Sequence, residues 1–223
     1  MLVIRKTPDA WWRAPARIEP HYLKESLPLL ATGLMTLLST RLDVMMLGWL
    51  SDAEAVGHYR FAAQLATLPL MIATTVQAIV SPSISRYHAE NRLPELKPLL
   101  VKMSAGAGIA ALGVSIAVIV LFSALLPVIG PSFEDARGPL IILLVAYGVM
   151  AVTYSGLPLL TMTGHAGDVA WSNAWAIACN VALNLMLIPR FGASGTALAT
   201  LASFVVLYAL HHRNVRRLGL LGA

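Results

Sequence analysis

Long apolar stretches separated by short polar segments run along most of the chain, and six of them are candidates for membrane-spanning helices. A helix needs ~20 apolar residues to cross a hydrocarbon core of ~30 Å. Five of the stretches meet this length, and the last is marginal with 18 residues. The predicted spans are residues 27–50, 59–81, 104–126, 139–162, 168–188 and 193–210.

The pattern within these stretches favours helices over strands. A membrane-spanning strand needs ~10 residues that alternate strictly between apolar and polar, and IAALGVSIAVIVLFSALL at 109–126 has no such alternation. A soluble helical bundle would need long polar helix faces, which the segments lack. The sequence therefore predicts an all-α polytopic membrane protein with a bundle of six transmembrane helices.

Composition supports this class of protein. Hydrophobic residues make up 57% of the chain and charged residues 12%, about half of the ~25% charge that soluble domains carry. This excludes a cytosolic globular enzyme, a disordered tail and a disulfide scaffold. The only cysteine, Cys179, has no second cysteine with which to form an internal disulfide.

The predicted organisation has three parts: a basic interfacial segment at 1–26, a six-helix lobe at 27–210 and a basic tail at 211–223. Charges recur throughout the first segment, without the apolar core of a signal peptide. Trp11 and Trp12 among arginines are typical of a segment that lies on the membrane surface. A basic leader without fixed structure fits the pattern equally well.

The distribution of basic residues predicts the orientation. With six spans both termini lie on one side, which receives twelve of the sixteen Lys and Arg residues, whereas the opposite side receives three. Loops rich in Lys and Arg remain cytoplasmic, so both termini are expected in the cytoplasm. The same residues can contact anionic lipid headgroups, and no nucleic acid is needed to explain the net charge of +5.

Polar residues inside the first predicted span form a stripe. Thr32, Thr36, Ser39 and Asp43 share one helix face at ~100° per residue. A carboxylate near the middle of a membrane helix costs ~2.5–3.5 kcal/mol, so Asp43 should face a bundle interior or a hydrated cavity. Arg41 lies on another side of the same helix, and we expect both charges to have partners elsewhere in the structure.

A second stripe lies in the fifth span, where Asn173, Asn180 and Asn184 share one face. These amides either join neighbouring helices or line a cavity, and the spacing fits both. Gln64 shares a face of the second span with Thr75. In the last span, small residues form a ridge that favours close helix packing. They are Gly195, Ala199 and Ser203.

Motifs for catalysis and metal binding are absent from the sequence. It contains no HExxH, no CxxC and no nucleophile elbow, and its six histidines have no metal-ligand spacing. We therefore expect no enzymatic activity, no catalytic residues, no metal site and no cofactor.

Two blocks of sequence carry a family resemblance. TRLDVMMLGWLSDAEAVGHYRFAAQLATLPLMIATTVQAIVSPSISRYH at 40–88 contains Asp43 followed by Leu-Gly, then VGHY at 56–59 and Pro82 after the second span. ACNVALNLMLIPRFGASGTALAT at 178–200 joins an Asn-rich helix through Ile-Pro and a Gly turn to a small-residue helix. These blocks resemble the carboxy-terminal half of lipid-linked polysaccharide flippases, members of the multidrug/oligosaccharidyl-lipid/polysaccharide exporter superfamily.

The resemblance implies a transporter of two six-helix lobes around a cavity that opens alternately to either side. This chain would be one lobe, and it would need a second lobe, either another chain or a second copy. The implied substrate is an undecaprenyl-pyrophosphate-linked oligosaccharide, moved across the bacterial inner membrane during polysaccharide or lipopolysaccharide biosynthesis.

The leading hypothesis is therefore a flippase lobe in which Arg41 supplies positive charge for the pyrophosphate. The candidate residues for substrate binding or cavity lining are Arg41, Asp43, Gln64, Asn173, Asn180 and Asn184. Two alternatives remain open: half of a cation-coupled drug exporter with Asp43 as a cation site, and a membrane scaffold or degenerate remnant that transports nothing.

Overall fold

The computed structural model describes residues 27, 30, 33–34, 41–153 and 156–221. Its regular elements are helical, and no strand occurs in this part of the chain. In chain order they are a helical run at 41–50, α2 (Ala53–Ala89), the 3₁₀ helix η2 (Leu93–Leu96), α3 (Lys97–Ile129), the 3₁₀ helix η3 (Pro131–Ala136), α4 (Arg137–Thr153), α5 (Gly156–Met162) and α6 (Ala166–Arg217).

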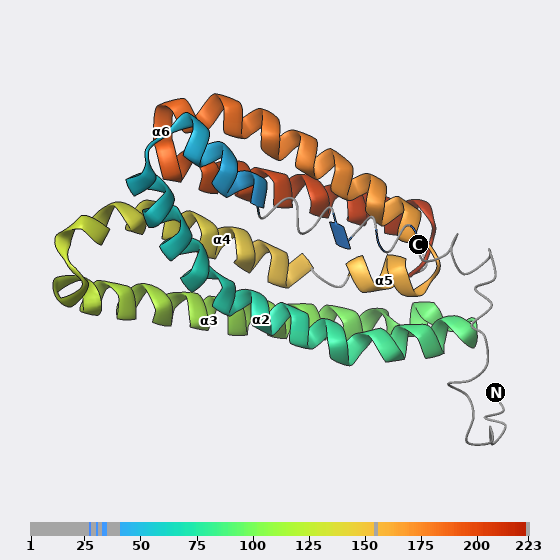
Figure 1. The fold of residues 1–223 in the computed structure, drawn as a ribbon. Helices are drawn as coiled ribbons and strands as arrows, with labels where there is room; N and C mark the ends of the chain where they lie inside the picture. Colours follow the sequence, from blue (N-terminus) through green and yellow to red (C-terminus); the bar gives the residue numbers. More distant parts are fainter. Residues whose placement is uncertain (1–26, 28–29, 31–32, 35–40, 154–155, 222–223) are drawn as a thin grey trace, which may run out of the picture.

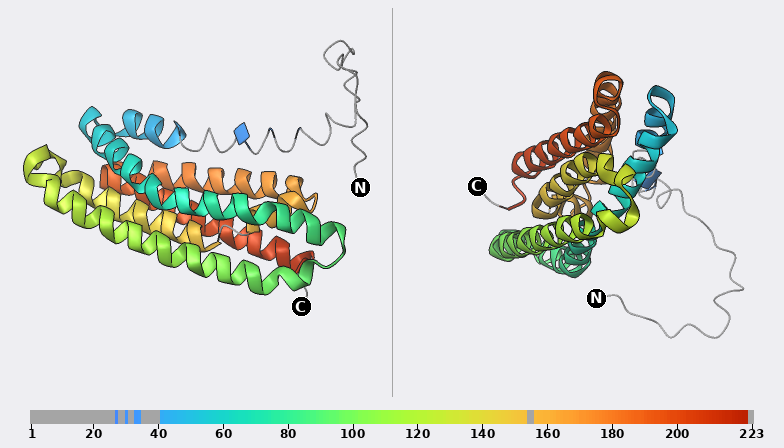
Figure 2. Two further views of the ribbon diagram at one scale, coloured as in Figure 1. Left: turned by 90° about the horizontal axis from the view of Figure 1, so that it is seen from below. Right: turned by 90° about the vertical axis from the view of Figure 1, so that its left-hand side faces the viewer.

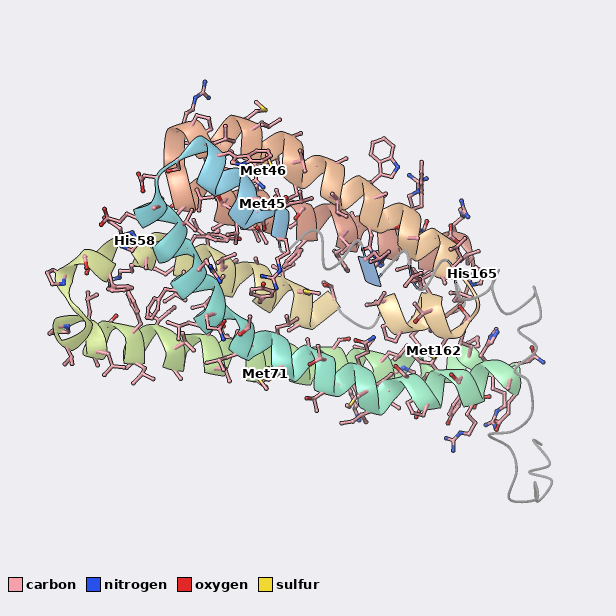
Figure 3. All side chains as sticks on the ribbon, in the orientation of Figure 1. Met45, Met46, His58, Met71, Met162 and His165 are labelled. Carbon is pink, nitrogen blue, oxygen red and sulfur yellow. The ribbon has the colours of Figure 1, made fainter. Side chains whose placement is uncertain are left out.

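The helices lie side by side, so their connections gather at two ends of an elongated bundle (Figure 1). The α2–α3 and α5–α6 connections and the C-terminus lie at one end, whereas the α3–α4 connection and a bend in α6 lie at the other. Figure 2 shows the same grouping from a second direction. His58 marks one end, and Met162 and His165 mark the other (Figure 3). With α4 and α5 taken together as one crossing, successive crossings thus run in opposite directions, as expected for a multi-pass membrane protein (Figure 1).

Four helical stretches of the described chain are long and apolar enough to cross a membrane. They are Ala53–Ala89, Leu93–Val128, Pro131–Thr153 and Ala166–Arg217. α2 and α3 extend beyond the predicted spans 59–81 and 104–126 at both ends. At the start of α2, the Asp52 side chain caps the helix by accepting a hydrogen bond from the backbone N–H of Ala55 at 2.7 Å. Much of the predicted first span lies outside the described residues.

The predicted fourth span contains two helices, α4 and α5, separated by residues 154–155, which are outside the described chain. The predicted fifth and sixth spans both belong to α6, which is interrupted at Gly192 (φ 52°, ψ −128°). Its two halves lie side by side as a hairpin (Figure 1). Asn214 donates to the Ser172 hydroxyl at 3.3 Å, and Arg217 lies 3.5 Å from Asp168, so both contacts join the ends of the hairpin.

Small and branched side chains allow the helices to approach closely. Ala62 and Ala66 of α2 are fully buried and belong to the same core as Leu140 and Leu143 of α4. Small residues at helix contacts permit the short backbone distances on which membrane helix packing depends. The outward side of α3 is apolar and exposed, with Ile109 75% exposed, as expected for a surface that faces lipid.

α2 changes direction partway along its length, close to Met71 (Figures 1 and 3). Pro69 lies two residues earlier, inside the helix. Because proline has no N–H to donate and its ring crowds the preceding turn, it is a common cause of such bends. The bend separates the first half of α2, which carries Tyr59 and Gln64, from the half that packs against η2 and the start of α3.

Gly195 provides a test of the α6 hairpin. A Cβ at this position would lie 2.5 Å from the backbone carbonyl oxygen of Leu187, a contact that requires the backbone to move. We expect Gly195→Ala to lower the free energy of unfolding by about 1–3 kcal/mol, measured by thermal unfolding in detergent. Gly113→Ala in α3, where nothing lies within 4 Å of the new Cβ, is the matched control and should be neutral or slightly stabilising. Equal effects of the two substitutions would contradict the tight hairpin.

Candidate functional site

The carboxylate of Asp43 is the centre of a polar cluster inside the bundle. It lies near the start of the helical run at 41–50 and is 6% exposed. The Asn184 amide donates to its Oδ1 at 2.8 Å, the Thr200 hydroxyl donates to its Oδ2 at 2.9 Å, and the Tyr59 hydroxyl donates to the same Oδ2 at 3.2 Å. These donors come from α2 and from both halves of α6, so one side chain connects three separate parts of the chain.

A second layer of polar groups surrounds the first. The Asn184 amide uses its other hydrogen for Oδ1 of Asn180 at 3.0 Å. The Thr200 hydroxyl also lies 3.0 Å from the backbone carbonyl of Thr196. Because that hydroxyl has a single hydrogen, the carboxylate and the carbonyl compete for it, and an ionised carboxylate is the stronger acceptor. The arrangement is therefore built to receive negative charge at Asp43.

Among the described residues, the groups in contact with Asp43 are hydrogen-bond donors and none of them is a cation. Within the described chain, no Lys, Arg or His nitrogen lies within 4.0 Å of its carboxylate. Burial of a carboxylate in a membrane costs several kcal/mol unless it is compensated, and hydrogen bonds to a charged group contribute about 1.5–3 kcal/mol each. Three such bonds offset the cost of burial. The cluster can therefore hold an anionic side chain that is open to exchange with a proton or a cation.

Beside this cluster lies a cavity of about 410 Å³. Its walls come from the helical run at 41–50, α2, α4, α5 and both halves of α6. Five of the six predicted site residues line it: Arg41, Asp43, Gln64, Asn173 and Asn180. The sixth, Asn184, is fully buried behind Asp43 and holds that carboxylate in position. The structure thus brings together side chains predicted on three different spans.

Positive charge predominates on the cavity wall. Arg41 and Arg60 both line it and both are exposed, whereas Asp43 is the only acidic side chain among its lining residues. His211 lines the cavity from the second half of α6. Apolar side chains occupy much of the remaining wall; they include Leu70, Met150, Leu157, Phe204 and Leu207. A cavity with this lining can accept an anionic group attached to an apolar or weakly polar body.

Sequence reasoning missed Tyr59 and Thr200, which both donate to Asp43. A signal for Thr200 was available, because Thr196, Thr200 and Ser203 recur at the spacing of one helix face. The neighbouring small residues Gly195, Ala199 and Ser203 were instead interpreted as a surface for helix packing. No periodicity indicates Tyr59, because it lies at the start of a span and reaches Asp43 only through the tertiary fold. Thr32, Thr36 and Ser39, which were predicted to share a face with Asp43, lie outside the described residues.

Within the described ranges, no three side chains among His, Cys, Asp and Glu are grouped so as to hold a metal ion. A cation at Asp43 would be surrounded chiefly by amide and hydroxyl groups, the donor set typical of weakly held, hard cations.

Comparison with known proteins shows which proteins the chain resembles. The model of the family described as "Polysaccharide biosynthesis protein" matches residues 21–88. A protein of Haloferax volcanii named "Probable flippase AglR" is 26% identical over 169 residues, which cover 74% of this chain and 35% of the relative. The chain is therefore similar to polysaccharide flippases. The "Probable low-salt glycan biosynthesis flippase Agl15" of the same organism is 24% identical over 174 residues, covering 76% of this chain and 36% of the relative.

The chain spans about a third of the length of these curated relatives. This partial coverage is consistent with one lobe of a larger transporter. No solved structure matches the chain. The family-model match at 21–88 includes Arg41, Asp43, Tyr59 and Gln64, so one wall of the cavity lies in the matched segment.

The hydrogen bonds at Asp43 lead to a prediction about stability. Asn184→Leu removes the donor to Oδ1 and leaves part of a buried carboxylate without a partner, which should lower the free energy of unfolding by about 1–3 kcal/mol. Asn173→Leu is the control, because Asn173 lies on the cavity wall and is only half-buried. Thermal unfolding of the purified variants in detergent measures both. If Asn184→Leu unfolds at the temperature of the wild type, the network does not hold the helices together.

Proposed function

We propose that this chain is one lobe of a flippase that moves a lipid-linked oligosaccharide across a membrane. The carrying observation is the cavity lined by Arg41 and Arg60 beside the buried carboxylate of Asp43, in a bundle whose helix α3 has an apolar outer side. A lipid-linked glycan has a phosphate-bearing head between a polar sugar and an apolar chain. The head would enter the cavity while the chain remains in the bilayer, so no long apolar chain has to cross a polar interior.

The electrostatics of the cavity favour a phosphate-bearing head. Arginine pairs with phosphate oxygens through two parallel hydrogen bonds, and Arg41 and Arg60 both line the cavity. The cavity volume of about 410 Å³ is within the ~300–1,000 Å³ of typical ligand pockets. It fits a pyrophosphate with one adjoining sugar, but not a complete oligosaccharide. The rest of the glycan would lie between this lobe and the second one.

We further propose that the substrate is an undecaprenyl-pyrophosphate-linked repeat unit, and that it is moved across a bacterial inner membrane toward the periplasm. The orientation with the C-terminus in the cytoplasm is supported by Lys and Arg residues at one end of the bundle. The α2–α3 connection and the end of α6 lie at that end (Figure 1), and these segments carry Arg86, Arg92, Lys97, Lys102, Arg213, Arg216 and Arg217. Both relatives are named as flippases, one of them for glycan biosynthesis, which supports the polysaccharide assignment over drug export.

A second lobe completes the proposed transporter. Transporters that alternate between two openings commonly move one helical repeat against another around a site at their interface. A single lobe provides only one side of such a site. The second lobe would be either a different chain or another copy of this one, and native mass measurement of the detergent-purified protein with its co-purified lipid distinguishes these arrangements.

Arg41 provides the direct test of the substrate. In a transporter assembled from this chain and its second lobe, we expect Arg41→Ala to reduce translocation of a reconstituted lipid-linked oligosaccharide by about tenfold or more. Loss of a charge-assisted hydrogen bond of ~1.5–3 kcal/mol gives this magnitude. Arg190→Ala is the matched control, because Arg190 is exposed and does not line the cavity. Unchanged transport by Arg41→Ala would show that this residue does not bind the substrate phosphate.

Asp43 tests whether the lobe couples transport to a cation or proton. The buried carboxylate without a basic partner among the described residues is the observation that favours coupling. Asp43→Asn keeps the polarity and size but removes the charge, and we expect ion-driven translocation to fall by about tenfold while lipid-linked substrate still binds. Transport assayed with and without an ion gradient measures this effect. If the ion gradient stimulates translocation by Asp43→Asn as strongly as it does by the wild type, Asp43 does not couple transport to the ion.

The same assays separate the alternatives. A cation-coupled drug exporter would respond to Asp43→Asn in drug efflux and would leave glycan assembly unchanged. A scaffold without transport activity would tolerate apolar replacements of Arg41, Gln64 and Asn180 with no loss of function.

A further inference from the structure

The α6 hairpin has a second groove on the face opposite the Asp43 cavity. Asn173, Ile177 and Asn180 point into the Asp43 cavity, whereas Trp171, Trp175 and neighbouring residues line the other groove. This groove has a volume of about 680 Å³ and runs between the two halves of α6 near the C-terminal end of the bundle. The flippase mechanism proposed above makes no use of it.

Two tryptophans dominate one wall of the groove. Trp171 is 67% exposed and Trp175 is 54% exposed, and their rings meet edge-to-face with centroids 6.0 Å apart. Such large aromatic side chains on the outer surface of a membrane protein concentrate at the level of the lipid headgroups, because their rings favour the boundary between acyl chains and water. Val206 and Leu210 of the second half of α6 provide an apolar wall opposite them.

Charged groups close the end of the groove that lies nearest the C-terminus. Arg213 and Arg217 lie one helical turn apart and both line the groove. Asp168 would repel an anion, but it lies 3.5 Å from Arg217, which neutralises it. In the described chain no acidic side chain lies within 4.0 Å of Arg213. The groove therefore combines apolar walls with the positive charge of Arg213 at one end. The two tryptophans indicate that this end lies at the level of the lipid headgroups.

We propose that this groove binds an anionic membrane phospholipid, with its phosphate on Arg213 and an acyl chain along Trp171, Trp175, Val206 and Leu210. Basic pockets between membrane helices are typical sites for acidic lipid headgroups. The apolar wall below the charge distinguishes a lipid from free phosphate, because an inorganic ion would gain nothing from the tryptophans. The proposal does not depend on the transported substrate.

Brominated lipids provide the test, since bromine quenches tryptophan fluorescence only on contact. The full chain carries five tryptophans, so the substitutions W11F, W12F and W49F leave Trp171 and Trp175 as the only reporters. The protein is reconstituted in phosphatidylcholine vesicles that contain increasing fractions of brominated phosphatidylglycerol or, separately, of brominated phosphatidylcholine. We expect the phosphatidylglycerol to quench at a severalfold lower mole fraction.

Arg213→Gln should reduce this preference about fivefold, which corresponds to the ~1 kcal/mol that one basic residue contributes at an anionic membrane surface. Arg216→Gln is the matched control. It removes the same charge from the same turn of α6, but Arg216 does not line the groove, so the preference should remain.

Four outcomes would overturn the proposal. Equal quenching by the two brominated lipids would mean that the groove does not select an anionic headgroup. Equal losses in the two arginine variants would mean a diffuse attraction to the surface. Absence of quenching by either lipid would mean that another protein surface, such as a second lobe, covers the groove. Added inorganic phosphate at millimolar concentration should not displace the lipid, and displacement would also contradict the proposal.

Discussion

The hydrogen bonds that converge on Asp43 connect the helical run at 41–50 to α2 and to both halves of α6. In a bilayer, apolar side chains gain little by leaving lipid for the protein interior, so hydrogen bonds and close packing carry much of the specificity of helix association. A buried carboxylate is costly unless its donors are present. Because an unpaired buried carboxylate would raise the free energy of the fold, the arrangement in which Asn184, Thr200 and Tyr59 all donate to Asp43 is favoured.

The α6 hairpin depends on local backbone geometry at its bend. Gly192 has a positive φ, which is accessible to glycine without steric cost, and Gly195 leaves room for the carbonyl of Leu187. Once the halves are antiparallel, the hairpin has two faces with different chemistry. One presents asparagines and a threonine to the Asp43 cavity, and the other presents tryptophans and arginines outward at one end of the bundle.

The cavity and the similarity to flippases support the proposed function by independent routes. The relatives are named as flippases, and the cavity has the positive charge and modest volume suited to a phosphate-bearing head. In the proposed function, charge and shape would give the cavity its selectivity, while the apolar helices would hold the chain in the membrane. The relatives are about three times as long as the matched segment, so in the proposed function a transported glycan would also contact protein beyond this chain.

The sequence by itself determined the class of fold, because only helices satisfy every backbone group across long apolar stretches. It also identified Asp43 and the asparagine stripe, since polar side chains in such stretches are conspicuous and their spacing defines one helix face. Only the tertiary structure decided which faces meet: Thr200 and Tyr59 contact Asp43 across 157 and 16 residues of sequence. The sequence pattern also predicted neither the division of the fourth span into α4 and α5 nor the position of Arg60 on the cavity wall. Periodicity fixes the direction of a side chain around its own helix, whereas contacts between helices depend on bends and packing that involve the whole bundle.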